Sequence, residues 1–590
     1  MSNTTWNGSA STDWATGANW STGSVPTTSA HVVIPDTSSI NNCVLDQNRT
    51  IGSLTIQANG TIVGGGFKLF IQSEGDASGG TEGFAVNNDG IISGNLDLEI
   101  NTPATTTCDF NGTSGNFQNV KLNHASVDAT FHTDTTFDGT LTIAAGTLKP
   151  QGGSTIAVAG HTSVTGTFGV ASGSGAHSFG SVIINSGGTF IATSGTTTVT
   201  SENASHAFRC SGGGTYTNND GTLEIQTAAQ TRLKMNGTGN VHNLTVNHAS
   251  CQLHMESDSS TTVEGDLTIT AGIVNTNTEG GASRDLTVRG GIKNTGTLTA
   301  NASTIIITGE IAGFAFDQMG TFNAGTSTIQ IGDGSTSTVG SSTHFKSNNC
   351  HNLIINQHID APNGNVAWRA YTGTEVTIGG NLTITRGRFY RNTSTQDLTV
   401  TGDVDIASVG KLGTSSASGS NTFGSIVIAG TYQATSGTTT ITNEKSGHAW
   451  KNNGGTFTHN NGKVLIDFDT GNLANSTEVK ENTFYDLEVK LDDAAYELRI
   501  EDHSSTNAMD ILNNLTVTKG IFDTMTKSDT LTIHGQTIIE SDGVFTQADH
   551  DTNKIIHNGI VRNSGTYKIN DGTTVKMNAG IRNLGTITVA

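Results

Sequence analysis

The sequence predicts an all-β protein, an elongated parallel β-solenoid (β-helix) built from four super-repeats of about 115–135 residues behind an aromatic N-terminal cap. Two observations carry this prediction. Short apolar runs such as SVIIN and TLTI alternate with stretches of Gly, Asn, Ser and Asp, as in proteins with many short strands. In addition, the same three motifs recur in the same order four times, which is typical of a stacked array.

The third of these motifs sets the long period. It reads GTLTIAAG at 139, GDLTITAG at 265, GNLTITRG at 380 and NNLTVTKG at 513, at intervals of 126, 115 and 133 residues. A shorter echo supports it, because ATSGTTTVT at 192–200 returns as ATSGTTTIT at 434–442. These positions predict super-repeats at 37–180, 181–300, 301–422 and 423–557, followed by C-terminal rungs at 558–590.

A finer period predicts the rungs. Strand-like triplets begin 15 residues apart at Leu141 and Ile156, and 23 apart at Leu244 and Leu267, so we expect rungs of about 15 to 25 residues. In LTITAG, the Leu and Ile would face the core and the Thr residues the solvent. Gly and Asn are expected at the corners, where positive φ is needed. About 25 rungs at roughly 4.8 Å each would extend on the order of 120 Å.

Residues 1–36 differ from the rest and predict a cap. They contain three of the five tryptophans of the chain, Trp6, Trp14 and Trp20. Two compatible interpretations stay open. The indoles either plug the first rung, which protects an open sheet edge, or they form a module that attaches the solenoid to a larger particle.

Composition excludes several classes of function. The formal net charge is −21 and no basic run is present, so no nucleic-acid partner is expected. No apolar run approaches 18 residues, so no membrane insertion is expected. The first residues lack a signal-peptide pattern, which favours a protein used without Sec export or one whose export signal was replaced. The five cysteines form no CxxC pair and are expected to be small buried hydrophobes.

No catalytic motif is present, so we expect no catalytic residue, no metal and no cofactor. His124 and His248 occur in the repeated NHAS, where a polar residue that stabilises a turn is expected. The strongest carboxylates for an alternative, polysaccharide-cleaving function lie in YELRIEDH at 496–503. There Glu497, Arg499 and Glu501 alternate and share one face, which is either a solvated ion-pair face or a binding surface.

The third super-repeat holds the densest aromatic and basic cluster of the chain, NVAWRAYTG at 365–373 and TRGRFYRNT at 385–393. Aromatic rings stack on sugars, and Arg forks onto carboxylates or phosphates. The glycan-binding candidates are Trp368, Arg369, Tyr371, Arg388, Tyr390 and Arg391, together with Arg386. The competing interpretation is a wide rung with the Trp in the core and the Arg side chains solvated.

The opening W-x-G…W…NW…G-x-x-P…V-x-I-P at 6–35, followed by Gly/Thr/Asn-rich rungs, resembles long β-solenoid surface proteins. Two groups share it, structural appendage proteins of tailed bacteriophages and secreted bacterial adhesins. The Met start without a signal peptide is more similar to the phage group. This resemblance implies a noncatalytic virion structural protein, a rod-like fibre or capsid or tail appendage, made in the host cytoplasm.

The same resemblance implies the partners. Other virion proteins would bind the N-terminal cap, and a host surface glycan would meet the outward strands. The assembly stays open between a homotrimer, common among phage fibres, and a single chain that closes its own core. The alternatives are a secreted surface adhesin or filament subunit, located outside the cell or on its surface, and a tailspike-type polysaccharide depolymerase.

Overall fold

A computed structural model gives the architecture of the chain. It describes residues 3–74, 83–112, 114–258, 260–335, 342–347, 349–357, 365–369, 375–391, 393–468, 476–501, 508–524, 530–546 and 554–589. These residues form two compact units, one of Met1–Arg289 with Lys293–Thr299, the other of Gly290–Ile292 with Ala300–Ala590. The division falls near residue 300, where the second super-repeat was expected to end.

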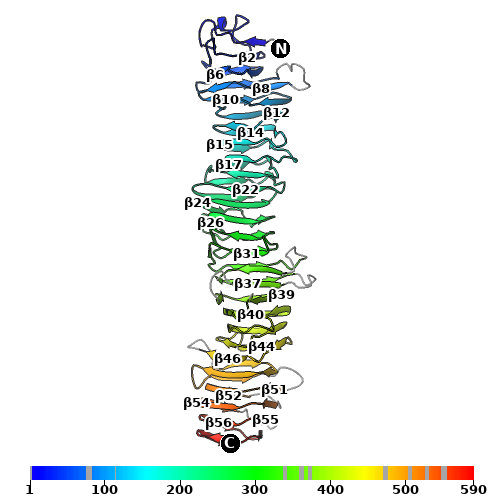
Figure 1. Cartoon of the computed structure of the whole chain (residues 1–590), viewed down its shortest axis with the longest axis vertical. Helices are drawn as coiled ribbons and strands as arrows, with labels where there is room; N and C mark the ends of the chain where they lie inside the picture. The colour runs from blue at the N-terminus through cyan, green and yellow to red at the C-terminus, as the bar shows by residue number, and fades with distance from the viewer. Residues whose placement is uncertain are drawn as a thin grey trace. The chain divides into compact units, whose positions relative to one another are not determined.

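The fold class is confirmed. The chain is all-β, with 59% of its residues in strands, and its parallel strands stack into a β-solenoid of about 22 turns. The one helical segment in the described part of the chain is a single 3-10 turn, Gly17–Asn19. In Figure 1, successive turns within each unit follow one another in the order of the sequence, as β14, β15 and β17 do in the first unit.

The length of one turn is longer than the shortest sequence spacing suggested. Leu223 in β22 (Thr222–Ile225) pairs with Leu244 in β24 (Asn243–Met255), and Leu244 pairs with Leu267 in β26 (Leu267–Asn275). These steps are 21 and 23 residues. By contrast, Leu141 pairs with Thr162, and not with Ile156. The expected spacing of 15 therefore joins two faces of one turn, which explains why about 22 turns are present instead of 25.

Alternation along each strand builds the core, as predicted. In β26, Leu267 and Ile269 are fully buried, whereas Thr268 between them is partly exposed. Because neighbouring turns are in register, Leu223, Leu244 and Leu267 lie in one column and remove apolar surface from water together. Each unit is thus held by columns of apolar side chains, one residue from each turn.

Glycine is required at a repeated kink in the long strands. Gly146 in β14 (Leu141–Pro150) has φ +76°, and Gly272 in β26 has φ +85°. A Cβ on Gly146 would lie 2.5 Å from the carbonyl oxygen of Val127 and 2.7 Å from that of His124. Both backbone conformation and space therefore exclude other residues, which accounts for the fixed glycine of the LTIxxG motif.

The repeated nonapeptides form matching corners in the two units. The carbonyl oxygens of Ala192 and Ala434, the first residue of each copy, accept hydrogen bonds from the side-chain amides of Asn219 (2.7 Å) and Asn460 (2.6 Å). Both asparagines have positive φ, 46° and 49°. Asparagine tolerates this region because its short side chain bonds to nearby backbone, so the predicted Asn corners are present.

The strands that position the sites belong to corresponding turns of the two units. In the first unit they are β20 (His206–Cys210), β23 (Gln230–Met235) and β24 (Asn243–Met255). In the second they are β39 (Leu382–Arg391), β40 (Asp397–Leu412), β44 (His448–Asn452), β47 (Ser476–Lys480), β50 (Glu497–Ile500) and β52 (Leu515–Asp523). Parallel pairing of β44 with β47, β47 with β50 and β50 with β52 places four successive turns side by side.

Candidate functional site

The three N-terminal tryptophans are internal. Trp6, Trp14 and Trp20 are at most 1% exposed. The ring of Trp20 meets those of Trp6 (4.9 Å between centroids) and Trp14 (4.7 Å) edge to face. The indole N–H of Trp6 donates to the carbonyl of Asn41 at 2.7 Å, and that of Trp20 to the carbonyl of Trp14 at 2.8 Å. The indoles are therefore core groups, and any attachment surface of residues 1–36 is made by other side chains.

The structure divides the aromatic and basic candidates of the third super-repeat. Tyr371 and the side chains of Trp368 and Arg369 lie outside the described residues. Arg388 donates to the carbonyl of Gly413 (2.8 Å) and to the side-chain oxygen of Gln433 (2.9 Å), and its guanidinium lies 5.7 Å from the centre of the Tyr390 ring. Both Arg388 and Tyr390 are partly exposed.

Arg391 is not a surface group. It is 9% exposed, and its Nη1 donates to the carbonyls of Gln396 (2.6 Å) and Ser420 (3.2 Å). Beside it, Phe389, Tyr432 and neighbouring residues line a cavity of about 10 Å³. That volume holds about one water molecule, so a sugar ring cannot enter it. Arg391 contributes to the fold of this turn, and only Arg388 and Tyr390 stay available to a glycan among the described candidates. Arg386 bonds to the carbonyl of Gly334 at 3.2 Å.

The strand at 497–500 alternates as predicted. Leu498 and Ile500 are buried, and Glu497 and Arg499 face outward and pair through two hydrogen bonds of 2.9 and 2.6 Å. The next turn adds a second carboxyl that sequence reasoning missed. Burial and the adjacent Glu497 carboxylate raise the pKa of Asp523 to about 8, so Asp523 is protonated at neutral pH and hydrogen-bonds to Glu497.

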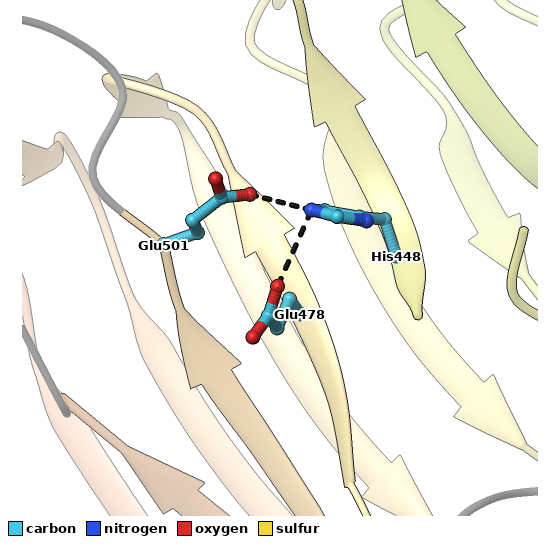
Figure 2. Close-up of side chains that lie close together, drawn as sticks. All are labelled: His448, Glu478 and Glu501. Carbon is cyan, nitrogen blue, oxygen red and sulfur yellow. Dashed lines mark hydrogen bonds and ion pairs between the residues drawn. The ribbon is translucent and has the colours of Figure 1, made fainter. Parts of the chain in front are cut away.

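A second charged group gathers around Glu501. Figure 2 shows the imidazole of His448 pointing at the carboxylates of Glu478 and Glu501. Nε2 of His448 lies 2.5 Å from Oε2 of Glu501 and 3.3 Å from Oε2 of Glu478. The three residues come from successive turns, because His448 in β44 pairs with Glu478 in β47, and Glu501 follows directly after β50. They could hold a metal ion.

Neighbouring groups fix the orientation of these side chains. Nδ1 of His448 lies 3.0 Å from the carbonyl oxygen of Ser446, in a corner where Ser446 and Gly447 have positive φ. Oε1 of Glu501 accepts a hydrogen bond of 3.0 Å from Lys480. Burial alone would raise the pKa of Glu501, but the bonds from His448 and Lys480 outweigh it and lower the pKa below its usual value.

This cluster could not be located from the sequence, although two of its parts were visible. Glu501 was placed on the outward face, and His448 opens a repeated motif. The 30 residues from His448 to Glu478 and the 23 from Glu478 to Glu501 differ in length, so no simple spacing connects them. The signal that could have found them is alignment with the second super-repeat, in which His206 holds the position of His448.

The histidines of NHAS stabilise corners, as expected. Nδ1 of His124 accepts a hydrogen bond from the backbone N–H of Ser126, and Nδ1 of His248 accepts one from Ser250, each at 3.1 Å. The five cysteines are free and buried. No helix within the described residues has the length and apolar character needed to span a membrane.

Comparison with family models, with curated proteins and with solved structures found no match for the chain. The site is therefore interpreted from its own geometry.

Proposed function

We propose that the chain is a noncatalytic structural protein of a bacteriophage virion, a fibre or a capsid or tail appendage. The observation that supports this proposal best is the continuity of the ladder within each unit. Turn after turn repeats the same buried columns, while the outward residues at corresponding positions change, as Asp128, Gln252 and Glu497 do. A constant scaffold with a variable surface suits a protein that spans a distance and contacts partners.

The strongest carboxyl pair argues for a structural role over a depolymerase. A glycosidase needs a proton donor and a second carboxylate that both reach the scissile bond. Asp523 carries the proton but is only 7% exposed, and Glu497 is neutralised by Arg499. The pair joins two turns of the solenoid and presents no acid to a bound sugar.

The proposal includes partners. Residues 1–36 would attach to other virion proteins through the surface around the buried indoles, and the outward face that bears Arg388 and Tyr390 would contact a host surface glycan. A homotrimer is the assembly to test first, by light scattering of the purified chain.

The decisive experiment locates the native protein. Phage particles from the strain that encodes the chain are purified, analysed by mass spectrometry and labelled with gold-conjugated antibodies against residues 375–589. We expect peptides of the chain in the particles and label on a capsid or tail appendage. Label on cell walls or free filaments, with particles that lack the chain, would replace this proposal with the secreted adhesin. Release of reducing sugars from host polysaccharide would replace it with the depolymerase.

A further inference from the structure

We propose that His448, Glu478 and Glu501 bind a divalent first-row transition-metal ion, with Zn²⁺ as the best fit. The site goes beyond the structural role of the chain and does not depend on it. Its evidence is the geometry of the three side chains, the groups that orient them, and an internal comparison with the corresponding turns of the first unit.

The ligand atoms lie at distances that a metal ion can bridge. A tetrahedral zinc ion with bonds of about 2.0–2.1 Å separates its ligand atoms by roughly 3.3 Å. Nε2 of His448 and Oε2 of Glu478 are 3.3 Å apart. Oε2 of Glu501, at 2.5 Å from the same nitrogen, needs to withdraw by roughly 0.8 Å, a small rotation for a side chain that is one-third exposed. The partly exposed Glu478 leaves the fourth position open to water.

The surroundings already hold the ligands in binding orientation. Metal-ligating histidines commonly donate their other ring N–H to a backbone carbonyl, and ligating carboxylates accept hydrogen bonds in turn. Nδ1 of His448 lies against the carbonyl of Ser446, which directs the lone pair of Nε2 at the carboxylates. Lys480 holds Oε1 of Glu501 and leaves Oε2 to the metal. With a neutral imidazole, these four side chains carry a net charge of −1, which favours a cation.

The second super-repeat contains the same corner with a built-in cation. Nδ1 of His206 lies 2.8 Å from the carbonyl of Ala204, as that of His448 does from Ser446. His206 pairs across the ladder with Arg232, the position that Glu478 occupies in the fourth super-repeat. Arg232 contacts Glu256 at 3.9 Å, where Glu501 stands in the second unit.

One residue thus distinguishes the two corners. In the first unit a guanidinium balances the carboxylate, and in the second a carboxylate replaces that guanidinium beside the same histidine. The additional negative charge makes a ligand set of one imidazole nitrogen and two carboxylate oxygens. Imidazole ligands select zinc and its first-row neighbours over Mg²⁺ and Ca²⁺, which prefer oxygen ligands alone.

The test uses the full chain, treated with EDTA and dialysed, and titrated with ZnCl₂ by calorimetry and by equilibrium dialysis. The variant Glu478→Arg installs the residue that the first unit carries at this position, so the fold is expected to tolerate it. His448→Gln is a second variant that removes the nitrogen ligand. Lys490→Gln, which removes an exposed lysine paired with Asp467, is the matched control.

We expect the wild type and Lys490→Gln to bind one Zn²⁺ more than either site variant. We also expect Zn²⁺ to slow hydrogen exchange in β44 and β47 of the wild type alone. MgCl₂ should give neither effect at equal concentration. Equal zinc stoichiometry in the wild type and His448→Gln, with equal exchange in β44 and β47, would overturn the proposal whether or not Glu478→Arg folds.

Discussion

Asp523→Asn tests the protonated carboxyl that joins β50 and β52. Asparagine has nearly the same shape, and its amide can donate to Glu497 as the protonated Asp523 does, but it has no proton to lose. We therefore expect the variant to keep the wild-type fold at low pH and to lose the pH dependence that Asp523 gives to this part of the solenoid.

The sign and size of the effect follow from the pKa. Burial and Glu497 raise the pKa of Asp523 from 3.8 to about 8, so between about pH 4 and pH 8 the folded chain holds a proton that the unfolded chain has lost. The stabilisation is fully present below pH 4 and falls as pH rises through 8. Each pH unit is worth about 1.4 kcal/mol, so the whole window is worth at most about 6 kcal/mol.

Hydrogen exchange measures this locally, which suits a repeat protein whose turns open separately. Protection factors of amides in β52, corrected for the intrinsic exchange rate, should fall in the wild type by up to about tenfold per pH unit from pH 5 to 8. Asp523→Asn should remove that fall, whereas Asp542→Asn, at an exposed carboxylate of the next turn, should keep it. Parallel profiles for the wild type and Asp523→Asn would refute the reasoning.

Three further predictions concern the cap, the third super-repeat and the thiols. Trp20→Ala leaves a cavity between two buried indoles and should cost about 3–5 kcal/mol, seen as rapid proteolysis within residues 3–34 and no change beyond residue 300; uniform resistance to protease would contradict it. Arg391→Met strips the carbonyls of Gln396 and Ser420 of a charged donor and should weaken protection in β39 by about 1–3 kcal/mol, whereas unchanged protection would show that those bonds contribute nothing. Burial raises the pKa of Cys108 to about 12, so a thiol reagent at pH 8 should label none of the five cysteines in the native chain and all five in guanidinium; fast native labelling would disprove their burial.

The fold was predictable from the sequence because each turn repeats the same local rule. Alternation in LTIT and a glycine such as Gly146 at the kink recur often enough to identify the array without any long-range information. The turn length was less accessible, since Leu141 and Ile156 look alike in sequence but lie on different faces of one turn.

The candidate sites were only partly predictable. Whether an Arg faces water depends on half a turn of strand register and on which carbonyls lie nearby, so Arg388 and Arg391 could not be told apart by composition. The partners of Glu501 depend on the number of residues in two intervening connections. Physical pairing across turns, which sequence spacing records only approximately, decides both outcomes.

The parallel ladder also determines how each unit carries mechanical load. Its backbone hydrogen bonds run from one turn to the next, so a pulling force along the stacking direction loads the turns in series. Every interface between turns then bears the full force, and the first to open is the one with the fewest bonds, such as β48 (Thr483–Phe484), which meets β51 (Ala508–Ile511) over only two residue pairs. Side-chain bridges between turns, such as those of His448 and Asp523, add tensile strength in that region of the second unit.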